Sequence, residues 1–320
     1  MSKKVEFNFN LHIPYVLSNY KIFDIGKDTN FNYFDEKKTG EIINLFSNMS
    51  YLEVNRILYN LIKINHNNFK FSLTISGVSI EIMKKYQPQL LESFKKLIST
   101  GNVEIKSGFY HSLNVPKVSK KEILEQVNEH KKIIEDTFNI KPTNFAKDFI
   151  NFNEFPIDSS DFVEKIIEKN NEIIKLGFNY DFFGIKNNSE SGVFEFLKYL
   201  PSNFLKNGFE FVIDSNNNEI HENNIIIKNQ MQHNLITNIS HLEELIKTSG
   251  NQEFIDNWKR ISNFDYILDL DNEFFKSNSK NNFLSTDNHY ELYIVIKNIL
   301  EDMNLKLSRI QNNENLILAN

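Results

Sequence analysis

The sequence predicts an α/β protein, in which a closed or nearly closed barrel of parallel strands is followed by a helical C-terminal region. Strand-like alternation and helix-like periodicity take turns over most of the chain, which is typical of strands joined by crossover helices. At least two of the expected strands have one plainly polar face. Beyond about residue 225 only the helical pattern continues. We therefore expect two domains, a shortened barrel over 1–225 and a helical region over 226–320.

The polar face is clearest in the first expected strand, residues 5–13. Its apolar side chains alternate with Asn8, Asn10 and His12, and Pro14 ends the run. The second strand, FKFSLTIS at 69–76, alternates in the same way. A parallel strand covered by helices on both faces should be apolar throughout, so we expect a barrel with apolar residues outward and polar residues inward. His12 would lie at the carboxyl end of its strand, where barrel enzymes keep their sites, or would be a buried histidine bonded to a backbone carbonyl.

The remaining elements follow from helical periodicity, capping residues and chain breakers. Segment 21–40 is interpreted as irregular, Gly101 ends a helix, and SKKE at 119–122 has the spacing of a capping box. The expected helices are 50–65, 79–99, 119–138, 160–176, 193–207, 229–249, 252–261 and 287–308. The further strands are 103–107, 144–149, 179–184 and 209–213.

Composition narrows the functional class. A net charge of −6 and a pI near 5.8 argue against a nucleic-acid partner, which needs a basic face. The chain has no cysteine, which excludes disulfides, thiolate metal sites and a cysteine nucleophile. There is no glycine-rich phosphate cradle and no HExxH motif, so we expect no cofactor and no metal. The start of the chain lacks the apolar core of a signal peptide, and no run approaches the ~18 apolar residues of a membrane span. We therefore expect a cytoplasmic protein without a membrane partner.

Several segments, taken in order, carry a family resemblance. They are His12-Ile13-Pro14, KIFDIG at 21–26, YFDEKKTGEI at 33–42, 69–105, YHSL at 110–113, 192–212, 229–261 and the final helix. Together they resemble glycoside hydrolase family 57, the α-amylase and 4-α-glucanotransferase group, and they span nearly the whole chain. The resemblance implies an incomplete (β/α)7-type barrel with appended helices, a role in carbohydrate metabolism, and an α-glucan or oligosaccharide ligand. It also implies ligand-binding roles for His12, Tyr110, His111 and Asp265.

The resemblance breaks at the two catalytic positions. A retaining glycosidase needs two carboxyl groups about 5–5.5 Å apart, one as nucleophile and one as acid/base. The family's nucleophile glutamate corresponds to Phe149, within NFAKDFINF, and its acid/base aspartate corresponds to Asn179, within NYDFFG. Phenylalanine cannot form a glycosyl ester, and asparagine cannot act as an acid. The stretch between the two positions is also shorter than in the family. On this alignment both catalytic roles are empty.

Nearby acids are candidate substitutes. Asp181 lies two positions after Asn179, so it shares the face of Asn179 if the strand continues. Asp148 is adjacent to Phe149 and would point to the opposite face, and Glu154 lies in a turn-like stretch before a proline. Each of the three also fits an ordinary surface acid or helix cap.

Three functions compete at this point. The first is a catalytically impaired family 57 relative, in effect a pseudoenzyme, that keeps a glucan-binding cleft. The second is an active α-glucan hydrolase or transferase with a relocated acid pair such as Asp148 and Asp181. The third is a non-catalytic scaffold or partner-binding subunit whose sugar site is filled by Phe149 and by Phe182 or Phe183. A metal-dependent polysaccharide deacetylase, a related barrel, is disfavoured because its histidine pair is absent. The sequence indicates no particular protein partner.

Overall fold

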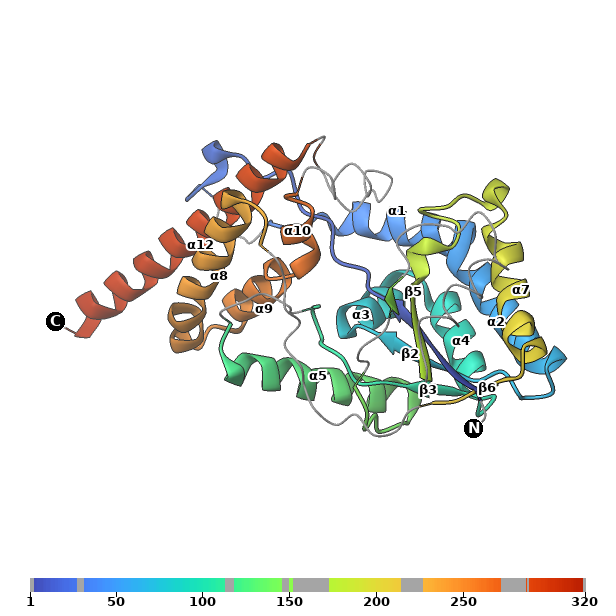
Figure 1. Ribbon diagram of the computed structural model, residues 1–320. Helices are drawn as coiled ribbons and strands as arrows, with labels where there is room; N and C mark the ends of the chain where they lie inside the picture. Colours follow the sequence, from blue (N-terminus) through green and yellow to red (C-terminus); the bar gives the residue numbers. More distant parts are fainter. Residues whose placement is uncertain are drawn as a thin grey trace. The chain divides into compact units, whose positions relative to one another are not determined.

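The computed structural model describes residues 3–27, 32–112, 118–145, 150–151, 173–213, 227–271, 286 and 288–318. The chain divides into two compact units (Figure 1). The first comprises 1–13, 40–110 and 127–221, and the second comprises 14–39, 111–126 and 222–320. The helical unit therefore takes in two segments from the N-terminal half, in addition to the C-terminal region. None of the described helices combines the length and apolar character needed to cross a membrane.

The first unit is built on one parallel sheet. Its strands are β1 Lys3–Leu11, β2 Phe71–Ile75, β3 Val103–Ile105, β4 Ile150–Asn151, β5 Ile173–Asn179 and β6 Phe209–Phe211. The order is β3-β2-β1-β5-β4, and β6 pairs with the start of β1. Just past β3, Ser107 pairs in parallel with Phe145, and the Ser107 N–H donates to the Asn144 carbonyl at 2.7 Å. Because Phe145 precedes β4 in the chain, the two ends of the sheet curl toward each other, as in an incomplete barrel.

Phenylalanine rings form the apolar side of this sheet. Phe7 makes edge-to-face contacts with Phe69, Phe178, Phe204 and Phe211, at centroid distances of 5.0–6.1 Å. Each such pair contributes about 0.5–1.5 kcal/mol beyond the area it buries. Helices α2 Leu52–Ile64, α4 Pro88–Ile98 and α7 Val193–Lys206 lie on one side of the sheet (Figure 1). The predicted apolar outer face of the first two strands is confirmed by these contacts.

One predicted helix and one segment predicted to be irregular differ from the structure. The helix expected over 79–99 is two helices, α3 Gly77–Tyr86 and α4, which meet at Gln87 with φ −140°. Proline at the first position of α4 lacks an N–H and keeps the preceding residue out of the helical region, which explains the break. Helix α1 Glu36–Phe46, followed by the π-helical turn η2 Ser47–Tyr51, begins inside the segment expected to be irregular.

The largest difference between prediction and structure is the position of the strand β5 along the sequence. Residues 173–176 were expected to end a helix and 179–184 to form a strand, but β5 runs from Ile173 to Asn179. It pairs with β1 along its whole length, from Lys4↔Ile173 to Asn10↔Asn179. The sequence IIKLGFN is compatible with the periodicity of a helix and with that of a strand. It forms a strand because it pairs with β1. The expected helix over 160–172 lies outside the described residues.

The other expected elements of the first unit are found close to their predicted positions. Helix α5 Lys120–Phe138 and helix α7 occupy the segments predicted for them. The 3-10 turns η3 Tyr180–Phe182 and η4 Ser189–Ser191 join β5 to α7. Of the strand expected at 144–149, the structure describes residues 144 and 145, with a parallel bridge at Phe145. Strand β4 follows at Ile150–Asn151.

The second unit is helical, as the C-terminal pattern predicts. It contains the 3-10 turn η1 Ile22–Asp24 and helices α8 Gln230–Ser249, α9 Gln252–Ile261, α10 Phe264–Leu268 and α12 His289–Leu318. Gly250, with φ +63°, ends α8, and the Asn251 side chain caps α9. Trp258 is fully buried and its Nε1–H donates to the Ile239 carbonyl at 2.9 Å, so it packs in the core of this unit.

The carboxylate of Asp302 anchors the early segment of this unit to α12. It accepts hydrogen bonds from the Tyr33 hydroxyl at 2.6 Å and the Gly26 N–H at 2.7 Å, and it pairs with Lys306 at 2.8 Å. Although burial alone would raise the pKa of Asp302, Lys306 and Tyr33 hold it below its usual value. The segment expected to be irregular is therefore fixed by side-chain contacts.

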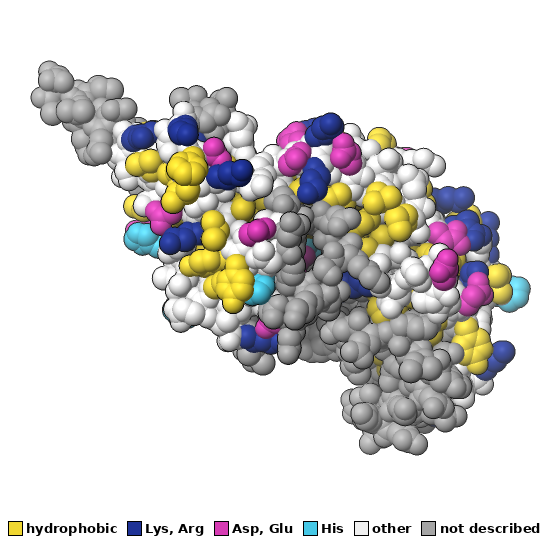
Figure 2. Space-filling model, turned by 90° about the horizontal axis from the view of Figure 1, so that it is seen from above, with side chains coloured by type: hydrophobic (Ala, Val, Ile, Leu, Met, Phe, Trp, Pro, Cys, Tyr) yellow, Lys and Arg dark blue, Asp and Glu magenta, His cyan; other side chains and the backbone are white. Residues whose placement is uncertain are grey.

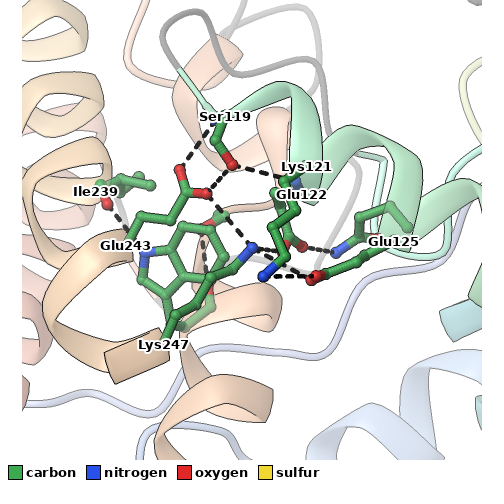
Figure 3. Close-up of polar contacts among 10 residues, drawn as sticks. Ser119, Lys121, Glu122, Glu125, Ile239, Glu243 and Lys247 are labelled. Atoms are coloured by element: carbon green, nitrogen blue, oxygen red, sulfur yellow. Dashed lines mark hydrogen bonds and ion pairs between the residues drawn. The ribbon is translucent and has the colours of Figure 1, made fainter. Parts of the chain in front are cut away.

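The start of α5 departs from the predicted capping box. The Ser119 hydroxyl accepts from the Glu122 N–H at 3.1 Å, as a cap should. The Ser119 N–H donates to Glu243 Oε2 at 3.0 Å, so the reciprocal arm comes from α8 and not from Glu122 (Figure 3). The Glu122 carboxylate faces Lys247 instead, at 2.6 Å.

Charged side chains of both signs are interspersed on the face of the molecule drawn in Figure 2. A nucleic-acid grip gathers lysine and arginine on one stripe or patch. The mixed distribution on this face agrees with the acidic net charge of −6.

Candidate functional site

The side of the sheet opposite the phenylalanines is polar across four strands. Along β1 it carries Glu6, Asn8, Asn10 and, just beyond the strand, His12. Residues paired across parallel strands point to the same side, so their partners on the neighbouring strands share this face. Those partners include Ser72 and Thr74 of β2 and Lys175, Gly177 and Asn179 of β5. The predicted polar inner face is thereby present, and we call it the polar wall.

From Glu6 onward along β1, the wall becomes more exposed toward the carboxyl end of the strand. Glu6 and Asn8 are buried, whereas Asn10 and His12 are half-buried. On β5, Lys175 near the start and Asn179 at the end are both half-buried. The accessible carboxamides and the histidine of the wall lie at the carboxyl ends of the strands, where barrel enzymes bind their ligands.

A buried ion pair between Glu6 and Lys106 lies at the end of the wall away from the carboxyl ends of the strands, and we call this end the floor. Lys106 Nζ lies 2.6 Å from Glu6 Oε1, and the two side chains are 1% and 0% exposed. One level higher, Asn8 Oδ1 accepts from the hydroxyls of Ser72 at 3.0 Å and Thr74 at 3.2 Å. These groups are partners of one another, so this floor serves the fold and offers no charge to a ligand.

Asn10, Asn179 and His12, at the carboxyl ends of the strands, form what we call the rim of the wall. Asn10 Nδ2 donates to Asn179 Oδ1 at 3.1 Å, which joins β1 to β5. His12 Nδ1 lies 2.8 Å from the Ser76 hydroxyl, which lies 2.6 Å from the Ser79 hydroxyl. The Ile13 N–H donates to Ser79 Oγ at 2.7 Å. His12 Nδ1 thus lies beside a serine hydroxyl, and the ligand-binding role of His12 stays a prediction.

Tyr110 lies beside the same helix start as His12. Its carbonyl accepts from the Val78 N–H at 2.9 Å, and its hydroxyl donates to Glu81 at 3.2 Å. The ring packs directly on Gly77, because a Cβ at that position would come within 2.4 Å of Tyr110 Cδ2. His12 and Tyr110 thus each contact the start of α3.

Asn179 and Asp181 have different environments. Asn179 ends β5 and faces the polar wall, whereas Asp181 lies in η3 and accepts from the Tyr51 hydroxyl. Burial, together with the neighbouring Asp181, raises the pKa of Tyr51 well above its usual value. The expectation that Asp181 shares the face of Asn179 fails, because the strand stops at Asn179 and the alternation ends with it.

The phenylalanines that follow are part of the apolar layer. Phe183 packs against Phe9 at 6.2 Å and against Phe178 at 5.8 Å, and Phe182 packs on Phe183. The prediction that Phe183 plugs a sugar site is therefore wrong, since its ring lies on the side of the sheet away from the polar wall, and the same role for Phe182 stays a prediction.

Three predicted positions, Asp148, Phe149 and Glu154, lie outside the described residues. His111 and Asp265 belong to the second unit. His111 is buried and its N–H donates to Gln126 Oε1 at 2.9 Å, and Asp265 lies in the first turn of α10, after the capping Asn263. Their ligand-binding roles stay predictions.

The sequence reading missed two residues that shape the site. Lys106 is one, because its partner Glu6 lies 100 positions away. His130 on α5 is the other: its Nε2 lies 2.8 Å from the Ile75 carbonyl and its Nδ1 accepts from the Gly108 N–H at 3.2 Å. Burial lowers the pKa of His130 to about 4, so this ring is neutral and ties β2 to the segment leading to Tyr110. Its place on the buried side of an amphipathic helix was the available signal. Among the residues described, no group of three or more His, Asp or Glu is placed to hold a metal ion.

The comparisons with known proteins agree with this architecture. Residues 6–150 match the model of glycosyl hydrolase family 57. A putative α-amylase of Methanocaldococcus jannaschii is 25% identical over 265 residues, which cover 63% of this chain and 56% of that protein. The chain thus spans little more than half of this curated relative.

Two solved structures share the fold. The 4-α-glucanotransferase of Thermococcus litoralis superposes with a TM-score of 0.55 and 10% identity, covering 83% of this chain and 56% of that one. A family 57 branching enzyme of Thermococcus kodakaraensis gives a TM-score of 0.56 at 10% identity, with 87% and 86% covered. The class of protein is therefore an incomplete α/β barrel with a helical region, as predicted. Within that class, the predicted resemblance is confirmed: residues 6–150 are similar to glycoside hydrolase family 57.

Proposed function

We propose that this protein recognises an α-glucan or a related oligosaccharide at the rim of its polar wall and does not cleave it with the family's pair of carboxylates. The observation that carries the proposal is Asn179. It occupies the position that the family resemblance assigns to the acid/base, and its side chain is bound to Asn10 on the polar wall. A carboxamide has no ionisable proton in the physiological range, so it cannot protonate a departing glycosidic oxygen.

The chemistry of the rim suits a neutral ligand rich in hydroxyls. Carboxamides offer both donors and acceptors, and a histidine ring offers one of each when neutral. The charged residues Glu6 and Lys106 are buried at the floor, where they neutralise each other. A sugar can therefore be bound at the rim by hydrogen bonds to the two carboxamides and the histidine ring.

The substitute acid that the sequence suggests lies in the turn after β5. The Asp181 carboxylate accepts a hydrogen bond from the hydroxyl of the buried Tyr51, whereas the Asn10–Asn179 pair lies on the polar wall. The alternative function is an active hydrolase or transferase that uses Asp181 with Asp148. That alternative predicts measurable cleavage, and the assay that closes the Discussion separates it from the present proposal.

Binding is tested by calorimetric titration of maltooligosaccharides into the full chain. We expect saturable binding that weakens roughly tenfold in Asn10→Leu, because the substitution removes polar contacts at the rim. Asn304→Leu is the matched control, since Asn304 is exposed on α12. Equal affinity in Asn10→Leu and wild type, or no binding at all, would refute a glucan site at this rim.

A further inference from the structure

The candidate lies in the second unit, around the ammonium group of Lys247 on α8. Lys247 Nζ lies 2.6 Å from Glu122, 3.2 Å from Glu125 and 3.4 Å from Glu243 (Figure 3). Glu122 is fully buried, and Lys247 itself is 20% exposed. Burial raises the pKa of Glu122, and the hydrogen bond from Lys247 opposes that shift. Buried Lys259 of α9 adds a second positive charge that acts in the same direction.

The charge on Glu122 determines the orientation of Gln126. Gln126 Nε2 donates to Glu122 Oε1 at 2.8 Å. An ionised carboxylate can only accept hydrogen bonds, so it selects the NH₂ end of the amide and turns the carbonyl end away. That carbonyl oxygen accepts from the His111 N–H at 2.9 Å. In the series Lys247–Glu122–Gln126–His111 the hydrogen bonds converge on the Glu122 carboxylate: Lys247 and Gln126 both donate to it, and the His111 N–H donates to the Gln126 carbonyl oxygen.

The backbone that follows His111 needs such support. Ser112 has φ +45°, a left-handed conformation that non-glycine residues rarely adopt. It is flanked by two hydrogen bonds, from the His111 N–H to Gln126 and from the Phe264 N–H to the Ser112 carbonyl at 3.3 Å. Strained conformations of this kind persist only where the surrounding contacts determine them.

We propose that Lys247 is a positioning residue: through Glu122 and Gln126 it fixes the backbone of His111. Neither the family match nor the predicted ligand residues point to Lys247. The importance of His111 for glucan binding rests on the proposed function, whereas the relay itself can be tested without any ligand.

The test is hydrogen exchange of the His111 amide in the full chain. We expect exchange to become roughly tenfold faster in Lys247→Met, which keeps the length of the side chain and removes its charge, and in Gln126→Met, which removes the acceptor. Lys247→Arg should retain protection. Lys121→Met is the control, because Lys121 is 79% exposed and lies 3.9 Å from Glu125. The amide of buried Leu300 in α12 reports on the second unit as a whole.

The outcomes are distinct. Faster exchange at His111 with unchanged exchange at Leu300 supports the relay. Protection of His111 in Lys247→Met, or equal acceleration at Leu300, overturns it, because the lysine would then have no role or only a general structural one. If Lys247→Met does not fold, Glu122→Gln makes the same test, since a neutral amide no longer fixes the orientation of Gln126. Faster His111 exchange without weaker maltooligosaccharide binding supports the relay and counts against a ligand role for His111.

Discussion

The two ends of the polar wall differ in chemistry: the floor holds a buried ion pair, and the rim holds a half-buried pair of carboxamides. At the floor, a full positive and a full negative charge meet in a site that is almost completely shielded from water. At the rim, two carboxamides meet at 3.1 Å in a half-buried position. Charge inside a barrel is costly unless it is paired, so Glu6 and Lys106 act on the fold. The rim keeps neutral groups whose hydrogen bonds can be exchanged for those of a ligand. The position of a polar residue along the strand therefore decides whether it serves stability or recognition.

The largest effect that this comparison predicts is at the floor. Lys106→Met leaves the Glu6 carboxylate buried without a partner, and we expect a loss of roughly 3–5 kcal/mol in the free energy of unfolding. Urea denaturation measures the loss. The double variant Glu6→Leu with Lys106→Met is the matched control, and it should recover most of the loss because no uncompensated charge remains. A loss below about 1 kcal/mol in the single variant would contradict a structural role for the pair.

The next effect depends on pH. His130 is neutral in the folded protein, and burial lowers its pKa to about 4 from 6.5. The unfolded chain therefore binds a proton first as the pH falls, so stability is lost from about pH 6.5 down to about pH 4. The slope is roughly 1.4 kcal/mol per pH unit for this one group.

The variant His130→Gln isolates that contribution. Denaturation at a series of pH values should show a shallower loss of stability in His130→Gln than in wild type between these limits. Parallel curves for the two proteins would show that His130 titrates normally, and would remove its role as a neutral link between β2 and the segment leading to Tyr110.

A smaller effect is expected at the rim. Gly77→Ala places a Cβ within 2.4 Å of Tyr110 Cδ2, so the ring must move. We expect a loss of about 1–3 kcal/mol in stability, as for other overpacked sites, together with weaker maltooligosaccharide binding. Gly101→Ala is a useful contrast, because it adds a Cβ in open space and strains only the backbone, at φ +74°. Unchanged binding in a folded Gly77→Ala protein would place Tyr110 outside the site.

The two faces of the sheet could be predicted from sequence because alternation is a local signal. The phenylalanines of β1 and the asparagines between them point to opposite sides, as a period of two requires. The pairing of Glu6 with Lys106 could not be predicted in this way, since only the order of the strands brings together residues 100 positions apart. The capping of Ser119 by Glu243, 124 positions away, is missed for the same reason.

The prediction for Asp181 failed for a different physical reason. It assumed that a strand continues past Asn179, whereas the chain turns into a 3-10 helix at Tyr180. Tyr180 is fully buried and its hydroxyl donates to Asn55 at 2.8 Å, a contact with α2 that local periodicity does not contain. Strand ends are set by such tertiary contacts, so the face of a residue just past a predicted end is the least secure part of a sequence-based site.

The most direct measurement of the central claim is the release of reducing ends from maltooligosaccharides by the purified full chain. The proposal predicts no release above buffer in wild type or in Asp181→Asn. It predicts gained activity only where acids return to both family positions, in Phe149→Glu with Asn179→Asp. Hydrolysis by wild type that is abolished by Asp181→Asn would contradict the account, because the protein would then cleave glucans with a relocated acid.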